Sequence, residues 1–163
     1  FYMEKTKESL DLYSNQILAL AGNIPLIERI SAPDITISKR SKLCGSMVTI
    51  DLSMKNNKII AYSHEVKACA LGQASASILA KDIIGKTDVQ IIAVRDSVVS
   101  MLKGANYSQD IFLDYRVLSP ASDFKNRHDS ILLVLEATVE AIKNISEDKS
   151  SVKLYSANRL NRQ

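Results

Sequence analysis

Two cysteines, Cys44 and Cys69, are the residues of this chain best suited to chemistry. Cys44 lies in a Leu-Cys-Gly-Ser turn before a strand pattern, and Cys69 lies where a strand pattern gives way to a helical one. A thiol at a helix start meets unpaired backbone N–H groups and the positive end of the helix dipole, which favour the thiolate. Because the thiolate is the form that binds metals and accepts sulfur, the pair predicts a metal-binding or sulfur-accepting site.

His128 is the candidate for a third ligand. Counted along the last expected helix, it falls on the same stripe as a row of apolar residues, namely Ile131, Leu132, Leu135, Val139 and Ile142. A buried imidazole needs a partner, and two thiolates with one imidazole make three of the four ligands of a tetrahedral zinc site. The same set can hold iron. The alternative is a hydrogen-bonded core histidine, which the pattern alone favours.

Other readings of these residues remain open. His64 is in phase with the more apolar face of its strand, so it is either a fourth ligand or, as we favour, an ordinary strand residue. A free cysteine is often just a small buried apolar residue. The chain contains no Gly-rich phosphate loop, no H-E-x-x-H, no C-x-x-C and no G-x-S-x-G, and a Cys–His hydrolase built from Cys69 and His128 has no further support.

Three strands are expected to bring the two cysteine-bearing turns to one edge of a sheet. Residues 47–54 and 59–66 alternate between apolar and polar side chains, as half-buried strands do. The segment 55–58 between them predicts a hairpin turn, since its two asparagines accept the positive φ that such turns require. Residues 35–40 alternate as well and, being rich in basic residues, suit an edge strand.

Helical patterns flank these strands. Residues 105–121 are expected to be irregular, with a short helical turn near 110–115. The expected helices run over 8–24, from Cys69 to before Gly85, from the capping box Thr87–Gln90 to Gly104, and from about 122 to 145. Grouped strands followed by helices predict an α+β fold: a three-stranded antiparallel sheet with helices packed on one face, an N-terminal helix and a long C-terminal helix.

The composition indicates an ordinary globular protein. The chain has 163 residues, of which 46% are hydrophobic and 24% charged, so residues 1–145 are expected to form one domain. Residues 146–163 lack a convincing core face and are expected to be an extended or loosely docked basic tail. Most of the net charge of +3 lies in that tail, which gives no nucleic-acid footprint.

A cytoplasmic setting is expected, with no membrane attachment. No stretch of about 18 apolar residues is present, and the start, FYMEKTKESL, lacks the apolar segment of a signal peptide. In such a compartment two cysteines are more often free thiols or ligands than a structural disulfide.

At these residues the chain resembles the iron–sulfur cluster assembly scaffolds of the IscU, SufU and NifU N-terminal family, with SufU as the expected nearer branch. The resemblance spans about 10–145 and is carried by Leu43-Cys44-Gly45 and by the helix start 69–77. It implies the α+β fold above. It also implies that the protein accepts sulfur from a cysteine desulfurase and holds a nascent cluster or a zinc ion, which the family does through three cysteines and an aspartate.

This chain departs from that family pattern at two positions. Ser46 stands where the aspartate would follow Cys-Gly, and Arg127 or His128 stands where the third cysteine would be. The resemblance therefore implies a non-enzymatic scaffold that holds iron, zinc or a transient cluster through Cys44, Cys69 and His128, with Cys69 as the leading sulfur acceptor. Two alternatives are a metal-free interaction module of the same fold and a desulfurase activator that uses one thiol.

Overall fold

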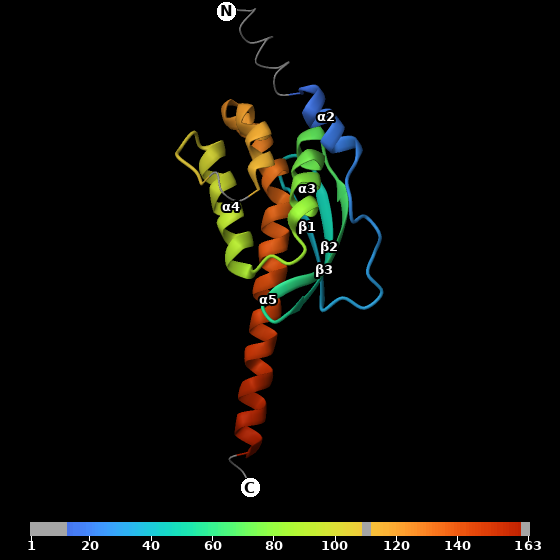
Figure 1. Cartoon of the computed structure of the whole chain (residues 1–163), viewed down its shortest axis with the longest axis vertical. Helices are drawn as coiled ribbons and strands as arrows, with labels where there is room; N and C mark the ends of the chain where they lie inside the picture. The colour runs from blue at the N-terminus through green and yellow to red at the C-terminus, as the bar shows by residue number, and fades with distance from the viewer. Residues whose placement is uncertain (1–12, 109–111, 161–163) are drawn as a thin grey trace, which may run out of the picture.

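The chain forms an α+β fold, seen in the computed structural model that describes residues 13–108 and 112–160 (Figure 1). The first twelve residues, which include the beginning of the helix expected over 8–24, lie outside the described part. The elements are α2 (Asn15–Gly22), β1 (Ile35–Arg40), β2 (Met47–Lys55), β3 (Lys58–Lys67), α3 (Ala70–Asp82), α4 (Asp88–Leu102), the 3-10 helices η1 (Leu113–Asp123) and η2 (Lys125–Arg127), and α5 (His128–Leu160).

The three strands form the predicted antiparallel meander, in the order β1-β2-β3. Asn56 and Asn57 close the β2–β3 hairpin with φ values of 52° and 62°, as expected from their tolerance of the left-handed region. The register of β2 and β3 shifts between Ser53 and Met54. A shift of this kind is a β-bulge, which bends the strand locally and re-aims a side chain.

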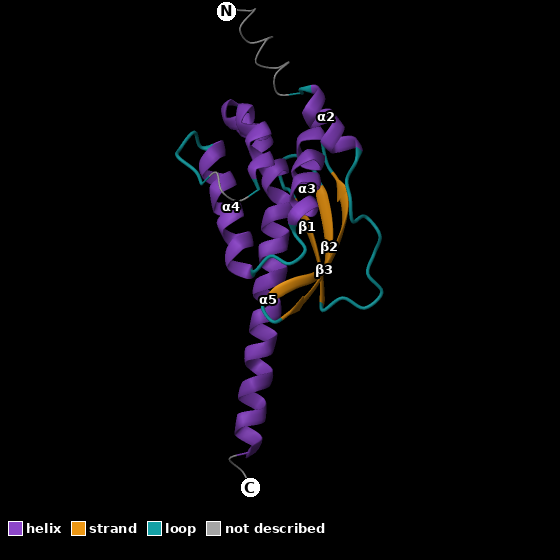
Figure 2. Ribbon diagram, in the orientation of Figure 1, coloured by secondary structure: helices purple, strands orange, loops and turns teal. Residues whose placement is uncertain are grey.

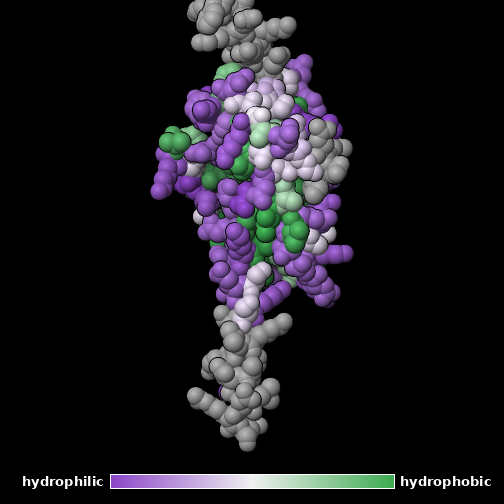
Figure 3. Space-filling model, turned by 90° about the vertical axis from the view of Figure 1, so that its left-hand side faces the viewer, coloured by the Kyte–Doolittle hydropathy of each residue, from purple (hydrophilic) through white to green (hydrophobic). Residues whose placement is uncertain are grey.

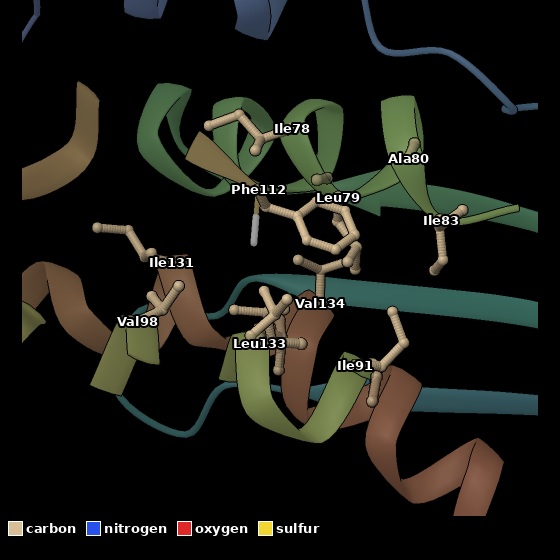
Figure 4. Close-up of a cluster of buried hydrophobic side chains, with 14 of the residues drawn as sticks. Ile78, Leu79, Ala80, Ile83, Ile91, Val98, Phe112, Ile131, Leu133 and Val134 are labelled. Carbon is tan, nitrogen blue, oxygen red and sulfur yellow. The ribbon is translucent and has the colours of Figure 1, made fainter. Parts of the chain in front are cut away.

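The core lies between one face of the sheet and the helices, as Figure 2 shows. α5 packs against α3, α4, β1 and β2, so it is the central helix of the fold. Figure 4 shows where side chains from α3, α4 and α5 meet around the buried Phe112. This arrangement confirms the predicted fold class, with the helices on one face of an antiparallel sheet.

The opposite face of the sheet is crossed by residues 23–34, which we call the strap (Figure 1). Its anchor is Asp51 of β2, whose side chain is completely buried. The carboxylate accepts hydrogen bonds from Arg29 Nε at 2.6 Å and Nη2 at 3.1 Å, from the Ile30 backbone N–H at 3.1 Å, and from Thr36 Oγ1 at 2.7 Å. These four bonds satisfy a carboxylate that would otherwise be costly to bury.

The helix starts are partly as predicted. The expected capping box of α4 is confirmed, because Thr87 Oγ1 accepts from the Gln90 N–H at 3.2 Å and the Gln90 side chain accepts from the Thr87 N–H at 2.9 Å. α3 begins at Ala70 with Cys69 as its N-cap, also as expected.

Both ends of the last helix were predicted wrongly. α5 begins at His128 rather than near Ser122, because η1 and η2 occupy the preceding residues. It ends at Leu160 rather than near Ile145. No glycine or proline follows Ile145 to stop the helix, so the part of the tail up to Leu160 continues α5 instead of being extended. This second half projects beyond the body of the molecule (Figure 1).

The face of the body drawn in Figure 3 is mostly hydrophilic. Figure 3 shows a narrow band of apolar side chains between hydrophilic ones, on the side where α4 lies in Figure 1. Within the described residues, none of the helices is both long enough and apolar enough to cross a membrane.

Candidate functional site

Cys44 lies in a short loop between β1 and β2. The loop is closed by the backbone bond from the Ser41 N–H to the Ser46 carbonyl, at 2.8 Å. Gly45 has a φ of +71°, a conformation that glycine adopts without strain and most other residues do not. The loop holds the Cys44 side chain out, so this thiol is exposed to solvent.

Cys69 lies at the N-terminus of α3, as the sequence predicted. Its backbone is extended, its carbonyl accepts the Gln73 N–H at 3.0 Å, and its side chain makes no capping bond. The thiol is half-buried and packs at the border of the core. It therefore sits beside the unpaired N–H groups at the start of the helix.

A pair of serine hydroxyls connects the two thiols. Cys44 Sγ donates to Ser46 Oγ at 3.1 Å, and Cys69 Sγ lies 3.1 Å from Ser130 Oγ. The two hydroxyls are buried and lie 3.4 Å apart, which is a long hydrogen bond. The fold thus brings together Cys44 and Cys69 in the way the sequence predicted, around a polar centre formed by Ser46 and Ser130.

Gly72 makes this close approach of α3 and α5 possible. A Cβ atom at this position would lie 2.5 Å from Ser130 Oγ, 3.0 Å from the Ser130 carbonyl oxygen and 2.8 Å from the Ala68 Cβ. One helical turn later, Ser75 Oγ donates to the Ile131 carbonyl at 2.7 Å, which fixes the same two helices again. The position of Ser130 is therefore set by the packing of α5 on α3.

The surroundings of Cys44 favour its thiolate. Hydrogen bonds from Ser41 and then Ser46 lower the pKa of the Cys44 thiol below its ordinary value, while burial and the charge of Asp129 act in the opposite direction. Asp129 is the exposed second residue of α5 and precedes Ser130. It lines one pocket together with Ser41 and Lys42, so Asp129 lies at the cysteine end of the molecule.

His128 makes a hydrogen bond within the protein, as the alternative to a ligand role expected. Its Nε2 lies 2.8 Å from the Ala121 carbonyl oxygen in η1, and the residue is half-buried in the first turn of α5. Arg127, the other candidate for this position, is half-buried in η2. Among the described residues, no group of three or more His, Cys, Asp or Glu side chains is positioned to hold a metal. A ligand role for His128 therefore stays a prediction.

His64 is a core residue, as the ordinary reading of its strand position expected. It is fully buried, and its Nε2 lies 2.9 Å from the Pro25 carbonyl oxygen of the strap. Burial lowers the pKa of this imidazole, and the bond to Pro25 partly opposes that effect.

Ser130 and Asp129 were missed by reasoning from the sequence. Because the helix was expected to start near Ser122, the sequence placed the candidate site residues at His128 and just before it, and Ser130 and Asp129 were not among them. A signal for Ser130 was present, since it is in phase with the buried residues Val134, Ala137 and Ala141 on α5. Nothing in the local pattern pointed to Asp129, because its relation to Cys44 depends on how α5 meets the loop before β2.

Comparison with known proteins places the chain in a family. No family model matches the chain, so its family is shown by individual relatives. The crystal structure of the N-terminal part of a nitrogen-fixing NifU-like protein from Brucella abortus is 40% identical, with a TM-score of 0.83, over 86% of this chain and 98% of that one. The iron–sulfur cluster assembly scaffold protein IscU of Thermotoga maritima is 23% identical over 135 residues, which are 83% of this chain and 95% of the relative.

A third relative supports the fold. The structure of an iron–sulfur cluster assembly scaffold protein for the SUF system, SufU, from Fervidobacterium islandicum AW-1 has a TM-score of 0.76 at 21% identity, over 80% of this chain and 96% of that chain. The predicted resemblance to this group is confirmed, while the expectation that SufU is the nearer branch stays a prediction. With 40% identity across nearly the whole NifU-like structure, this chain is a member of the NifU-like N-terminal family, to which IscU and SufU are related.

Proposed function

We propose that this protein is an iron–sulfur cluster assembly scaffold that holds a nascent cluster, as its cargo, between Cys44 and Cys69. The observation that carries this proposal is the joining of the two thiols through Ser46 and Ser130 at one end of the molecule. Thiolates are the ligands that iron–sulfur clusters use. The names of the relatives, which are cluster assembly scaffolds, support the same function.

The buried hydroxyls suit a site that is filled and emptied. When cargo is absent, Ser46 and Ser130 satisfy both thiols, so neither polar group is left unpaired. On binding iron, each thiol would release its proton to solvent and turn from the serine to the metal, and the two hydroxyls, which lie 3.4 Å apart, could stay paired with each other. A cargo site in which the empty state is also satisfied holds its cargo less firmly than a dedicated metal site.

The third ligand is either His128 or Asp129, which are neighbours in the first turn of α5. His128 would have to release the Ala121 carbonyl, whereas Asp129 already acts electrostatically on Cys44. An imidazole nitrogen and a carboxylate oxygen are both ligands for zinc and iron. Zinc in place of iron remains part of this proposal, as does a cytoplasmic setting without enzymatic activity.

The test is the iron, zinc and acid-labile sulfide content of protein purified and reconstituted without oxygen. We expect bound metal in the wild type and its loss in Cys44→Ala and Cys69→Ala. His128→Ala and Asp129→Asn identify the third ligand, with Arg127→Ala as the matched control on the preceding residue. No metal in the wild type after reconstitution would contradict the scaffold function and favour the metal-free interaction module.

A second role, sulfur acceptance, is supported by the exposure and lowered pKa of Cys44. A cysteine desulfurase is the proposed partner. The Cys44 thiolate attacks the outer sulfur of the desulfurase persulfide, a new S–S bond forms on Cys44, and the desulfurase thiolate leaves. This assigns the first transfer to Cys44 rather than to the half-buried Cys69, which the sequence had favoured. Mass spectrometry after incubation with a desulfurase and cysteine should find the added sulfur on Cys44. If the Cys44→Ser variant still takes up sulfur, on Cys69, the assignment is overturned.

A further inference from the structure

The strap presents two apolar side chains to solvent, and one of them belongs to a residue in a strained conformation. Leu26 has a φ of +58° and is 38% exposed, and its neighbour Ile27 is 61% exposed. The other described non-glycine residues with positive φ are the two turn asparagines and Phe112, whose side chain is buried in the core. A left-handed leucine is unfavourable, and here no core packing compensates for it.

The protein holds this strained segment firmly in place. The His64 N–H donates to the Leu26 carbonyl at 3.0 Å, and the His64 ring bonds the Pro25 carbonyl at 2.9 Å. The strap is thereby attached to the free edge of β3, with Leu26 and Ile27 facing outward. We call the three consecutive residues Leu26, Ile27 and Glu28 the knob; Glu28 is also exposed and is not in an ion pair with any described residue.

A hollow lies further along β3, toward the hairpin. Its volume is about 440 Å³, and its apolar lining includes Ile60 and Ile84, which are 54% and 50% exposed. Ile60 is the extra residue of the bulge: Ser53 pairs with Ala61 and Met54 pairs with Ile59, so Ile60 has no partner on β2. The bulge therefore turns this isoleucine out of the sheet.

The lining of the hollow is basic as well as apolar. Lys55 and Lys58 are both exposed, and the lining contains no carboxylate. The knob offers two apolar side chains followed by a carboxylate, and the hollow offers two apolar side chains beside ammonium groups. The two surfaces are therefore complementary in both hydrophobicity and charge.

The knob and the hollow lie at the two ends of one strand edge. The knob is attached at His64, and the segment that carries Ile84 is attached at Ile59 through bonds from the Gly85 N–H at 2.7 Å and to the Lys86 carbonyl at 2.9 Å. A twofold axis across the β3 edge, midway between these points, would lay the knob of each copy over the hollow of the other. Such an interface is isologous and closes as a dimer.

We propose that a second copy of this chain docks along the β3 edge, with knob and hollow paired twice in a twofold dimer. Each pairing alone is small, so the symmetric repeat is what makes the interface specific, and the association is expected to be weak and concentration-dependent. The β3 strands run antiparallel across the axis. Since Cys69 follows the end of β3, the two cysteine ends point in opposite directions and both stay open.

The test is sedimentation equilibrium of the full chain over rising concentration, at low and at moderate salt. We expect a monomer–dimer equilibrium with no larger species, and weakening by salt because Glu28 pairs with lysines. Ile27→Ser and Ile84→Ser should each raise the dissociation constant by about tenfold or more, since each removes two buried apolar contacts per dimer. Leu18→Ser, which removes an equally exposed apolar side chain on α2, is the matched control and should leave it unchanged.

Further variants separate docking from folding. Leu26→Gly removes the strain, because glycine accepts the positive φ, so it should keep or raise the thermal stability while it abolishes the dimer. Glu28→Lys and Lys58→Glu should each weaken the dimer, and the double variant should restore it. A monomer at every concentration, growth beyond the dimer, or a dimer that Ile27→Ser leaves intact would each overturn the proposal. Cluster binding through the cysteines is measured separately and does not depend on this outcome.

Discussion

The two loops that flank β1 are built in opposite ways. The strap, residues 23–34, is fixed to the sheet by a fully buried carboxylate that accepts four hydrogen bonds. The loop 41–46 after β1 contains the exposed Cys44 and is held by one short backbone bond and by a bond of 3.5 Å from the Cys44 N–H to Ser41 Oγ. Ser46 Oγ adds contacts of 3.1 Å to Cys44 Sγ and 3.4 Å to Ser130 Oγ. The strap is therefore held by a buried carboxylate and its ion pair, whereas the cysteine loop is held by neutral hydrogen bonds, two of which are long.

This difference fits the proposed function. The strap closes the outer face of the sheet and positions the knob, so rigidity there serves the fold. In the proposed scaffold, the Cys44 thiol would exchange its hydrogen bond with Ser46 for a bond to cargo, and weaker hydrogen bonds in its loop would let the thiol turn without disturbing the sheet. Substitutions in the strap should therefore change stability, and substitutions around the cysteine loop should change reactivity.

The largest effect is expected from Asp51→Asn. The amide retains the shape of the side chain but loses the charge, and its NH2 group faces donors, so the free energy of unfolding should fall by about 3 kcal/mol. Urea unfolding followed by circular dichroism measures it. Ser38→Ala, which removes an exposed hydroxyl pair with Thr49 on the same side of the sheet, is the control and should change little. Equal stability of Asp51→Asn and wild type would remove the contrast between the loops.

Gly72→Ala should come next. The new Cβ would meet Ser130 and Ala68 at distances that real side chains do not tolerate, so α3 and α5 must separate, at a cost of about 2 kcal/mol. The same change should displace Ser130 from Cys69 and lower the metal content after reconstitution. Gly22→Ala is the matched control, because a Cβ there meets nothing within 4 Å. Thermal unfolding of the two variants should show a large drop for the first only.

The pH dependence of stability sharpens the same contrast. Burial alone would raise the pKa of Asp51, but hydrogen bonds from Arg29, Thr36 and Ile30 hold it below its ordinary value of 3.8. The folded state therefore binds this proton less tightly than the unfolded state. The stabilisation is complete above the unfolded pKa and is lost as the pH falls through the lower folded value. The stability difference between wild type and Asp51→Asn should thus shrink in acid, and a difference that is constant down to pH 2 would contradict the assignment.

The smallest effect is expected at the cysteine loop. Cys44 should react with iodoacetamide faster than Cys69, because it is exposed and its pKa is lowered by Ser41 and Ser46. Ser46→Ala should slow the reaction of Cys44 a few-fold near neutral pH and leave the unfolding free energy nearly unchanged. Peptide mapping of the alkylated protein gives both rates. Faster labelling of Cys69 would reverse the expected order of the two thiols.

The fold was largely predictable because its signals are local. The alternation of β2 and β3, the two turn asparagines and the Thr87–Gln90 capping box each depend on residues within a few positions of one another. The cysteines could be found for the same reason, since a thiol before a helical pattern is recognisable from the sequence. The beginning of α5 could not, because the 3-10 helices before it are specified by packing and not by a repeating pattern.

By itself, the sequence determined the sheet, the helix order and the two thiols at one end of it. The tertiary structure alone decided which groups surround those thiols. Ser130 is 61 residues from Cys69 and meets it only because Gly72 lets α5 approach α3 closely. A change of one residue in a helix rotates a side chain by about 100°. The partner of His128 and the place of Asp129 therefore depended on the true start of α5, which contacts distant in sequence set.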